Sequence, residues 1–124
     1  MPQVLASAAR TATTAAQMTG YSPAREAALM LIIDVTAVTT STITPSIQLY
    51  DDTLSTYFDF ITFGAISGTG TYVYVVREGE ASVASPITEV HNRKIPSSDK
   101  LQLNIVSGDS SSWTYSATVL WYQA

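Results

Sequence analysis

Cysteine is absent from this chain, and histidine occurs once, as His91. Without cysteine the chain can form no disulfide and offers no thiolate to a metal, which fits a protein made in a reducing cytoplasm. A single imidazole leaves zinc with only carboxylates as further ligands. We therefore expect no metal site and no cofactor.

Charge is also scarce, because Asp, Glu, Lys and Arg make up 13% of the 124 residues and the net charge is −4. Proteins that bind nucleic-acid backbones cluster their Lys and Arg, and the nearest approach here is the pair Arg93-Lys94. The longest apolar run, Ala27 to Ile33, is too short to span a bilayer, and the N-terminus lacks the pattern of a signal peptide. We expect neither nucleic acid nor a membrane as a partner, and no export by a signal peptide.

Serine and threonine are abundant instead, supplying 32 of the 124 residues. They alternate with Val, Ile, Leu, Tyr and Phe, and this spacing of two is the pattern of half-buried strands. Acid–base catalysis needs titratable groups, of which the chain has few. The composition favours a β-sandwich that binds or assembles, and we predict that the protein is not an enzyme.

The alternation predicts one all-β domain, an antiparallel, jelly-roll-like sandwich of about seven to eight strands. Strands are expected near residues 7–14, 28–38, 43–50, 56–63, 71–77, 101–105 and 113–121. Residues 1–20 are predicted to form an extended N-terminal arm leading into the first edge strand, and residues 21–124 the sandwich. A short helical turn is expected at 23–28, a hairpin connection at 64–70 and a long crossover at 78–98.

The titratable residues offer little chemistry. His91 could serve a Ser/His/Asp triad, but no G-x-S-x-G elbow is present, so a surface loop histidine is expected. The pair Asp51-Asp52 and Asp109 fall in predicted turns, where Asp bonds the local backbone. Asp34 lies within an apolar strand, and we expect it to be buried and paired with Thr36 or with an arginine.

The aromatic residues suggest a binding surface. Tyr72 and Tyr74 alternate with Val73 and Val75, so both rings share one face of a strand. Such a face is expected to contact a protein partner or to stack against a sugar, unless the rings fill the core. For Trp113 and Trp121 we expect core positions.

Three segments together resemble a known family. They are Arg10-Thr11-Ala12-Thr13, the strand ending in Ile33-Asp34-Val35-Thr36-Ala37-Val38, and Ile43 to Tyr50, followed by the G-x-x-x-G-T-G connection. This order is similar to that in a group of small β-sandwich proteins encoded among the virion genes of tailed bacteriophages. Pro96 matches a late proline of that pattern, although an aromatic–Arg pair of the family is replaced here by Ser97 to Lys100.

The resemblance implies a virion component synthesised in the host cytoplasm, namely a decoration (cement) protein on the capsid surface. A head–neck or tail accessory protein and a carbohydrate-binding module are the alternatives. The expected partner is the major capsid protein or a neighbouring virion protein, with a homo-oligomer, a trimer by analogy. Residues assigned to partner contact are Arg10, Thr11 and Thr13 on the arm, Tyr72 and Tyr74, and Arg93 in the long loop. The arm is expected to be disordered until it binds a neighbour.

Overall fold

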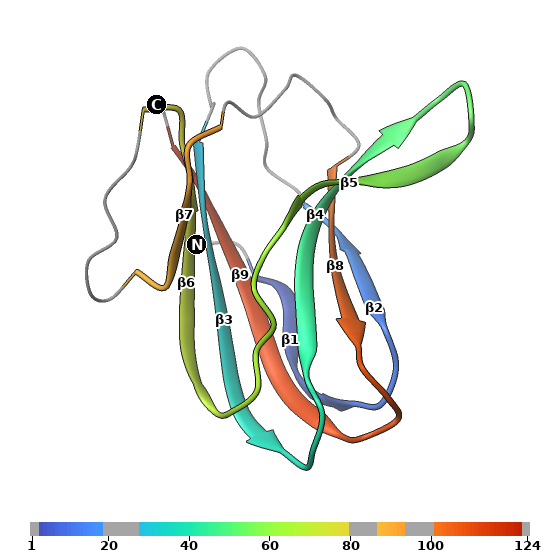
Figure 1. Cartoon of the computed structure of the whole chain (residues 1–124), viewed down its shortest axis with the longest axis vertical. Coiled ribbons are helices and arrows are strands. Elements are labelled where there is room, and N and C mark those ends of the chain that lie inside the picture. The colour runs from blue at the N-terminus through green and yellow to red at the C-terminus, as the bar shows by residue number, and fades with distance from the viewer. Residues whose placement is uncertain (1–2, 19–27, 80–86, 94–100, 123–124) are drawn as a thin grey trace.

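The computed structural model describes residues 3–18, 28–79, 87–93 and 101–122, which form nine β-strands in two facing sheets (Figure 1). The strands are β1 (Gln3–Arg10), β2 (Thr14–Gln17), β3 (Ala28–Val38), β4 (Ile43–Asp51), β5 (Thr56–Thr62), β6 (Gly70–Val76), β7 (Glu89–His91), β8 (Leu101–Ser107) and β9 (Trp113–Tyr122). The predicted all-β sandwich is confirmed. The expected helical turn falls on residues 23–27, outside the described residues, and on Ala28, which begins β3.

The strand order is that of a jelly roll. One sheet runs β1-β9-β3-β6-β7 and the other β2-β8-β4-β5. Without β7, two four-stranded sheets remain in which only the β4–β5 connection stays within a sheet, and every other connection crosses between them. Sheet neighbours are therefore mostly remote in sequence. This arrangement is the eight-stranded jelly roll that the composition predicts.

The core is built by alternation along the central strands. In β3, Leu29, Leu31 and Ile33 point between the sheets and are fully buried. Leu31 is paired on one side with Tyr74 and on the other with Val119, so the same face continues across three strands. The facing sheet contributes Ile43, Ile47, Leu101, Leu103 and Ile105. Burying each such side chain contributes roughly 1.5–3 kcal/mol.

The N-terminal segment is not a free arm in this structure. From Gln3 onward, β1 pairs with β9 and β2 pairs with β8, so one short stretch supplies an edge strand to each sheet. The expected single edge strand at 7–14 is two strands, separated at residues 11–13. Small residues, mostly Ala, continue on both sides of the bend, so the sequence marks no boundary between the strand that joins β9 and the strand that joins β8.

Two connections also differ from the predictions. The loop at 64–70 joins β5 in one sheet to β6 in the other, so it is a crossover and not a hairpin connection. Within it, Ile66 forms an isolated bridge with Ile43 and is buried. The expected long loop at 78–98 contains β7, which pairs in parallel with β6. A three-residue strand carries too short a pattern to be recognised in the sequence.

The β4–β5 hairpin projects beyond the two-sheet body (Figure 1). Its turn is closed by Asp51, whose Oδ1 accepts the backbone N–H groups of Thr53 (2.8 Å) and Leu54 (3.2 Å). Ser55 takes a positive φ of 52° at the end of the turn. The hairpin is thus a locally closed finger whose tip extends past the residues that fill the core.

Candidate interaction surfaces

The tyrosine face of β6 points inward. Tyr74 is 1% exposed and packs on Phe63, with ring centroids 4.6 Å apart. Tyr72 is packed against the core and donates its hydroxyl hydrogen to the Gly68 carbonyl (2.9 Å). The prediction that both rings share one face is confirmed, and of the two alternatives, partner contact or core packing, the structure shows core packing, because the register pairs Tyr72 and Tyr74 with the core residues Ile33 and Leu31.

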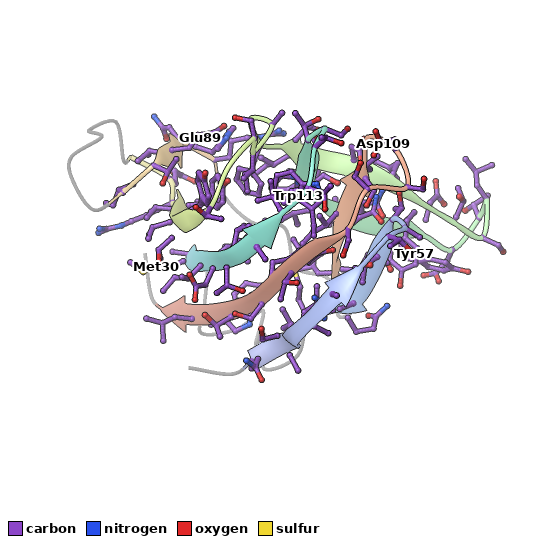
Figure 2. All side chains as sticks on the ribbon, turned by 90° about the horizontal axis from the view of Figure 1, so that it is seen from below. Met30, Tyr57, Glu89, Asp109 and Trp113 are labelled. Carbon is purple, nitrogen blue, oxygen red and sulfur yellow. The ribbon has the colours of Figure 1, made fainter. Side chains whose placement is uncertain are left out.

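Burial raises the pKa of Tyr74 far above its ordinary value, and the negative charge of Glu89 raises it further. Tyr74 therefore stays neutral and serves packing. Trp113 and Trp121 are also buried, as expected, and Trp113 Nε1 donates to the Thr40 carbonyl (3.0 Å). Figure 2 shows Trp113 among the side chains between the sheets.

Arg10 is bound to its own chain. Its guanidinium donates to the carbonyls of Ala6 (2.6 Å), Ala8 (3.1 Å) and Tyr115 (2.6 Å), and it lies 4.6 Å from the centre of the Tyr115 ring. These contacts join β1 to β9 across the sheet edge. The assigned partner contact is therefore an internal clamp in this structure.

The other assigned contacts, Thr11, Thr13 and Arg93, are all exposed, and two of them also bond to the rest of the chain. Thr11 is exposed at the bend between β1 and β2, whereas the Thr13 hydroxyl accepts the backbone N–H of Ser107 (3.2 Å). Arg93 donates to the Phe60 carbonyl (2.7 Å) and lies 4.2 Å from the centre of the Phe60 ring. Since β5 and β7 belong to different sheets, Arg93 links the two sheets at one side of the sandwich.

His91 is paired with Glu89. His91 Nε2 lies 2.7 Å from Glu89 Oε1, while Glu89 Oε2 accepts the backbone N–H of Gly64 (3.0 Å). The His91 ring also meets Phe63 edge-on at 5.1 Å. The geometry uses the only histidine to fasten β7 to the β5–β6 connection.

The described carboxylates hold local structure. Asp109 accepts the backbone N–H of Ser111 (2.7 Å), and hydrogen bonding to Ser111 lowers the pKa of Asp109, as expected for a turn. Asp34 is exposed and accepts a hydrogen bond from the Thr71 hydroxyl (3.2 Å). The expectation that Asp34 is buried is wrong, because it lies on the outward face near the end of β3, where the hydrogen bond shown among the described residues comes from Thr71.

The tip of the β4–β5 hairpin carries the most exposed large apolar side chains of the described residues. Leu54 is 70% exposed and Phe58 is 49% exposed. Phe58 is paired with Leu49, which packs against the core, but Phe58 itself stands on the edge strand β5 and remains half exposed. An apolar surface is thus presented on a projecting element.

The outward face of the four-stranded sheet carries a row of polar side chains that sequence reasoning missed. Gln17, Gln102, Gln48 and Asp59 stand side by side on β2, β8, β4 and β5. Gln102 Nε2 donates to Gln48 Oε1 (2.6 Å), and Gln48 Nε2 donates to Asp59 Oδ1 (3.0 Å). The alternation predicts which residues point outward, but only the register aligns them.

Two tyrosines lie beside this row. Tyr50 and Tyr57 are paired on neighbouring strands, and their rings meet edge to face with centroids 5.0 Å apart. Gln17 Nε2 donates to the Tyr57 hydroxyl (2.5 Å), which ties β2 to the hairpin. Figure 2 shows Tyr57 where the hairpin leaves the body, near the end of β2.

Comparison with protein-family models, with curated proteins and with solved structures finds no match to this chain. Among the described residues, no helix could span a membrane. Within the same ranges, no three His, Asp or Glu side chains are grouped to hold a metal ion.

Proposed function

We propose that this protein is a structural component of a tailed-bacteriophage virion, a decoration protein that attaches to the major capsid shell. The proposal begins from the resemblance carried by Arg10 to Thr13, Asp34 to Val38 and Ile43 to Tyr50. The jelly roll is also a fold that viral capsid proteins use, although a fold alone does not define a function. The structural roles of Arg10, Glu89, His91 and Asp109 are consistent with a non-enzymatic protein.

The observation that carries the proposal is the projecting β4–β5 hairpin with Leu54 and Phe58 exposed. Apolar side chains on a protruding element suit insertion into a depression on a partner, where buried aromatic anchors supply most of the binding energy. Many identical sites on a shell would then offset weak single contacts. The hairpin takes the attachment role first expected of the N-terminal arm.

A co-sedimentation assay tests this proposal with capsids assembled from the major capsid protein encoded nearest to this gene. The wild-type chain is expected to saturate the shell, and the double variant L54D/F58S to bind about tenfold more weakly or worse. V106S is the matched control, because Val106 is 43% exposed but lies on β8, away from the hairpin. It should bind as the wild type does.

Failure of the wild-type chain to bind any capsid would overturn the decoration role. Equal binding by L54D/F58S and the wild type would remove the hairpin from the attachment site. Binding to purified necks or tails in place of capsids would instead favour the head–neck or tail accessory alternative.

A further inference from the structure

We infer that the outward face of the four-stranded sheet is a binding site for a neutral oligosaccharide. The proposed site consists of Gln17, Gln48, Asp59, Gln102, Tyr50 and Tyr57. It is independent of capsid attachment and lies on a different surface from the inward-facing tyrosines of β6.

The first argument is the hydrogen-bonding capacity of the polar row. An amide carries two N–H donors and a carbonyl oxygen with two lone pairs, whereas the contacts between Gln102, Gln48 and Asp59 use one N–H of each glutamine. Counting contacts among the described residues, the row keeps further donors and acceptors on Gln48, Gln102 and Asp59. Sugar hydroxyls donate and accept at once, which is the chemistry that such a mixed row can satisfy.

The second argument is preorganisation. The amides of Gln48 and Gln102 are oriented by hydrogen bonds along the row and that of Gln17 by the Tyr57 hydroxyl, so a ligand would find the side chains in place and would lose less affinity to their ordering. Strands lie about 4.8 Å apart, which makes the row roughly 14 Å long, the length of a short oligosaccharide. Beside it, Asn104 is paired with Ala15 on one side and with Ser46 on the other.

The third argument is the pair Tyr50 and Tyr57, which lie along one side of the row. Tyr57, although it belongs to β5, reaches Gln17 at the β2 end through its hydroxyl. Aromatic rings present an apolar face and, in tyrosine, a polar tip, so they can stack on the C–H face of a sugar while bonding a hydroxyl. The Tyr57 ring is fixed from both sides, by the Tyr50 ring at 5.0 Å and by Gln17 through its hydroxyl.

Charge selects the class of ligand. The strands β2, β4, β5 and β8 contain no Lys or Arg, and their only carboxylates are Asp51 and Asp59. Phosphate, sulfate or carboxylate groups would find no cation on these strands and would meet the Asp59 carboxylate. The site therefore suits an uncharged glycan.

The test is an NMR titration of the full ¹⁵N-labelled chain with cellohexaose, maltohexaose and mannohexaose at millimolar concentrations, and with a heparin hexasaccharide as the charged comparison. At least one neutral hexasaccharide is expected to shift amide resonances of β2, β4, β5 and β8. Q48A/Q102A and Y57A should each weaken that binding about tenfold. The control Q3A/T118A changes an outward-facing pair on the other sheet and should bind normally.

The chemical-shift changes of the wild-type chain locate the bound oligosaccharide on their own, so the test remains decisive even if a variant folds poorly. The proposal is overturned if no neutral oligosaccharide causes shifts, if the shifts map to other strands, or if only the heparin fragment binds. It is also overturned if this face shifts with protein concentration alone, because the occupant would then be a second copy of the chain. None of these outcomes bears on capsid attachment, which the sedimentation assay measures separately.

Discussion

At the scale of single residues, polar groups in this protein are used to hold the fold together. Arg10 satisfies three carbonyl groups, Glu89 bonds both His91 and the Gly64 backbone, and Asp51 closes the hairpin turn. The Tyr115 hydroxyl is buried and finds no hydrogen-bond partner among the described residues. With so few ionisable side chains, most of those described have a structural role.

Tyr74 makes the free energy of unfolding depend on pH in the alkaline range. Its pKa is raised in the folded chain, whereas in the unfolded chain it ionises near pH 10. Above that pH the unfolded state loses the proton that the folded state retains, so stability from this group is complete below about pH 10 and is lost as pH rises. The loss amounts to at most about 1.4 kcal/mol per pH unit.

We expect Y74F to shift the midpoint of alkaline unfolding upward, measured by far-UV circular dichroism between about pH 9 and 12. The control is Y57F, since Tyr57 lies outside the core. An unchanged midpoint in Y74F would contradict the assigned cause.

At the scale of elements, the two N-terminal strands protect the edges of the sandwich. Without β1 and β2, the strands β9 and β8 would expose unpaired N–H and C=O groups, and such edges pair with other chains. Deleting residues 1–17 is therefore expected to lower the melting temperature by about 10 °C or more and to cause aggregation, measured by thermal melting and size-exclusion chromatography. A soluble truncated chain with unchanged melting would show that the segment is a dispensable arm.

R10A is the milder variant for the same element. It keeps both strands but removes three hydrogen bonds and a ring contact, so we expect a loss of about 1–2 kcal/mol in urea unfolding. R10K retains the charge without the planar guanidinium and should recover only part of the stability that R10A loses.

At the scale of the whole molecule, one apolar cluster spans both sheets. Side chains from β3, β6 and β9 meet those from β4 and β8, so neither sheet has a core of its own. We expect a single unfolding transition in urea, with coincident curves from circular dichroism and from the fluorescence of Trp113 and Trp121. Because most sheet neighbours are remote in sequence, refolding should be slow, on the order of milliseconds to seconds. Two separated transitions would contradict this view of the core.

The sandwich could be predicted because alternation is local. Leu101, Leu103 and Ile105 alternate with polar residues within the seven residues of β8, and this alternation identifies the buried face. Alternating apolar residues identify the buried faces of β4 and β9 in the same way. The crossover at 64–70 could not be predicted, since a Gly-rich loop between two strands has the same composition whether it stays in a sheet or leaves it. The sequence does not reveal β7, because a three-residue strand is too short to show an alternating pattern. It does not reveal that the N-terminal segment forms two strands, because the residue pattern continues across the bend between them.

The sequence by itself determined the fold class, the alternation of faces, the turn roles of Asp51 and Asp109 and the core positions of Trp113 and Trp121. Only the tertiary structure decided which face points inward in strands such as β3 and β6, because both of their faces carry apolar residues and the alternation does not mark one of them as polar. That choice buried Tyr74, exposed Asp34 and turned Arg10 back onto β9. It also aligned Gln17, Gln102, Gln48 and Asp59, which come from four segments and meet through cross-strand register alone.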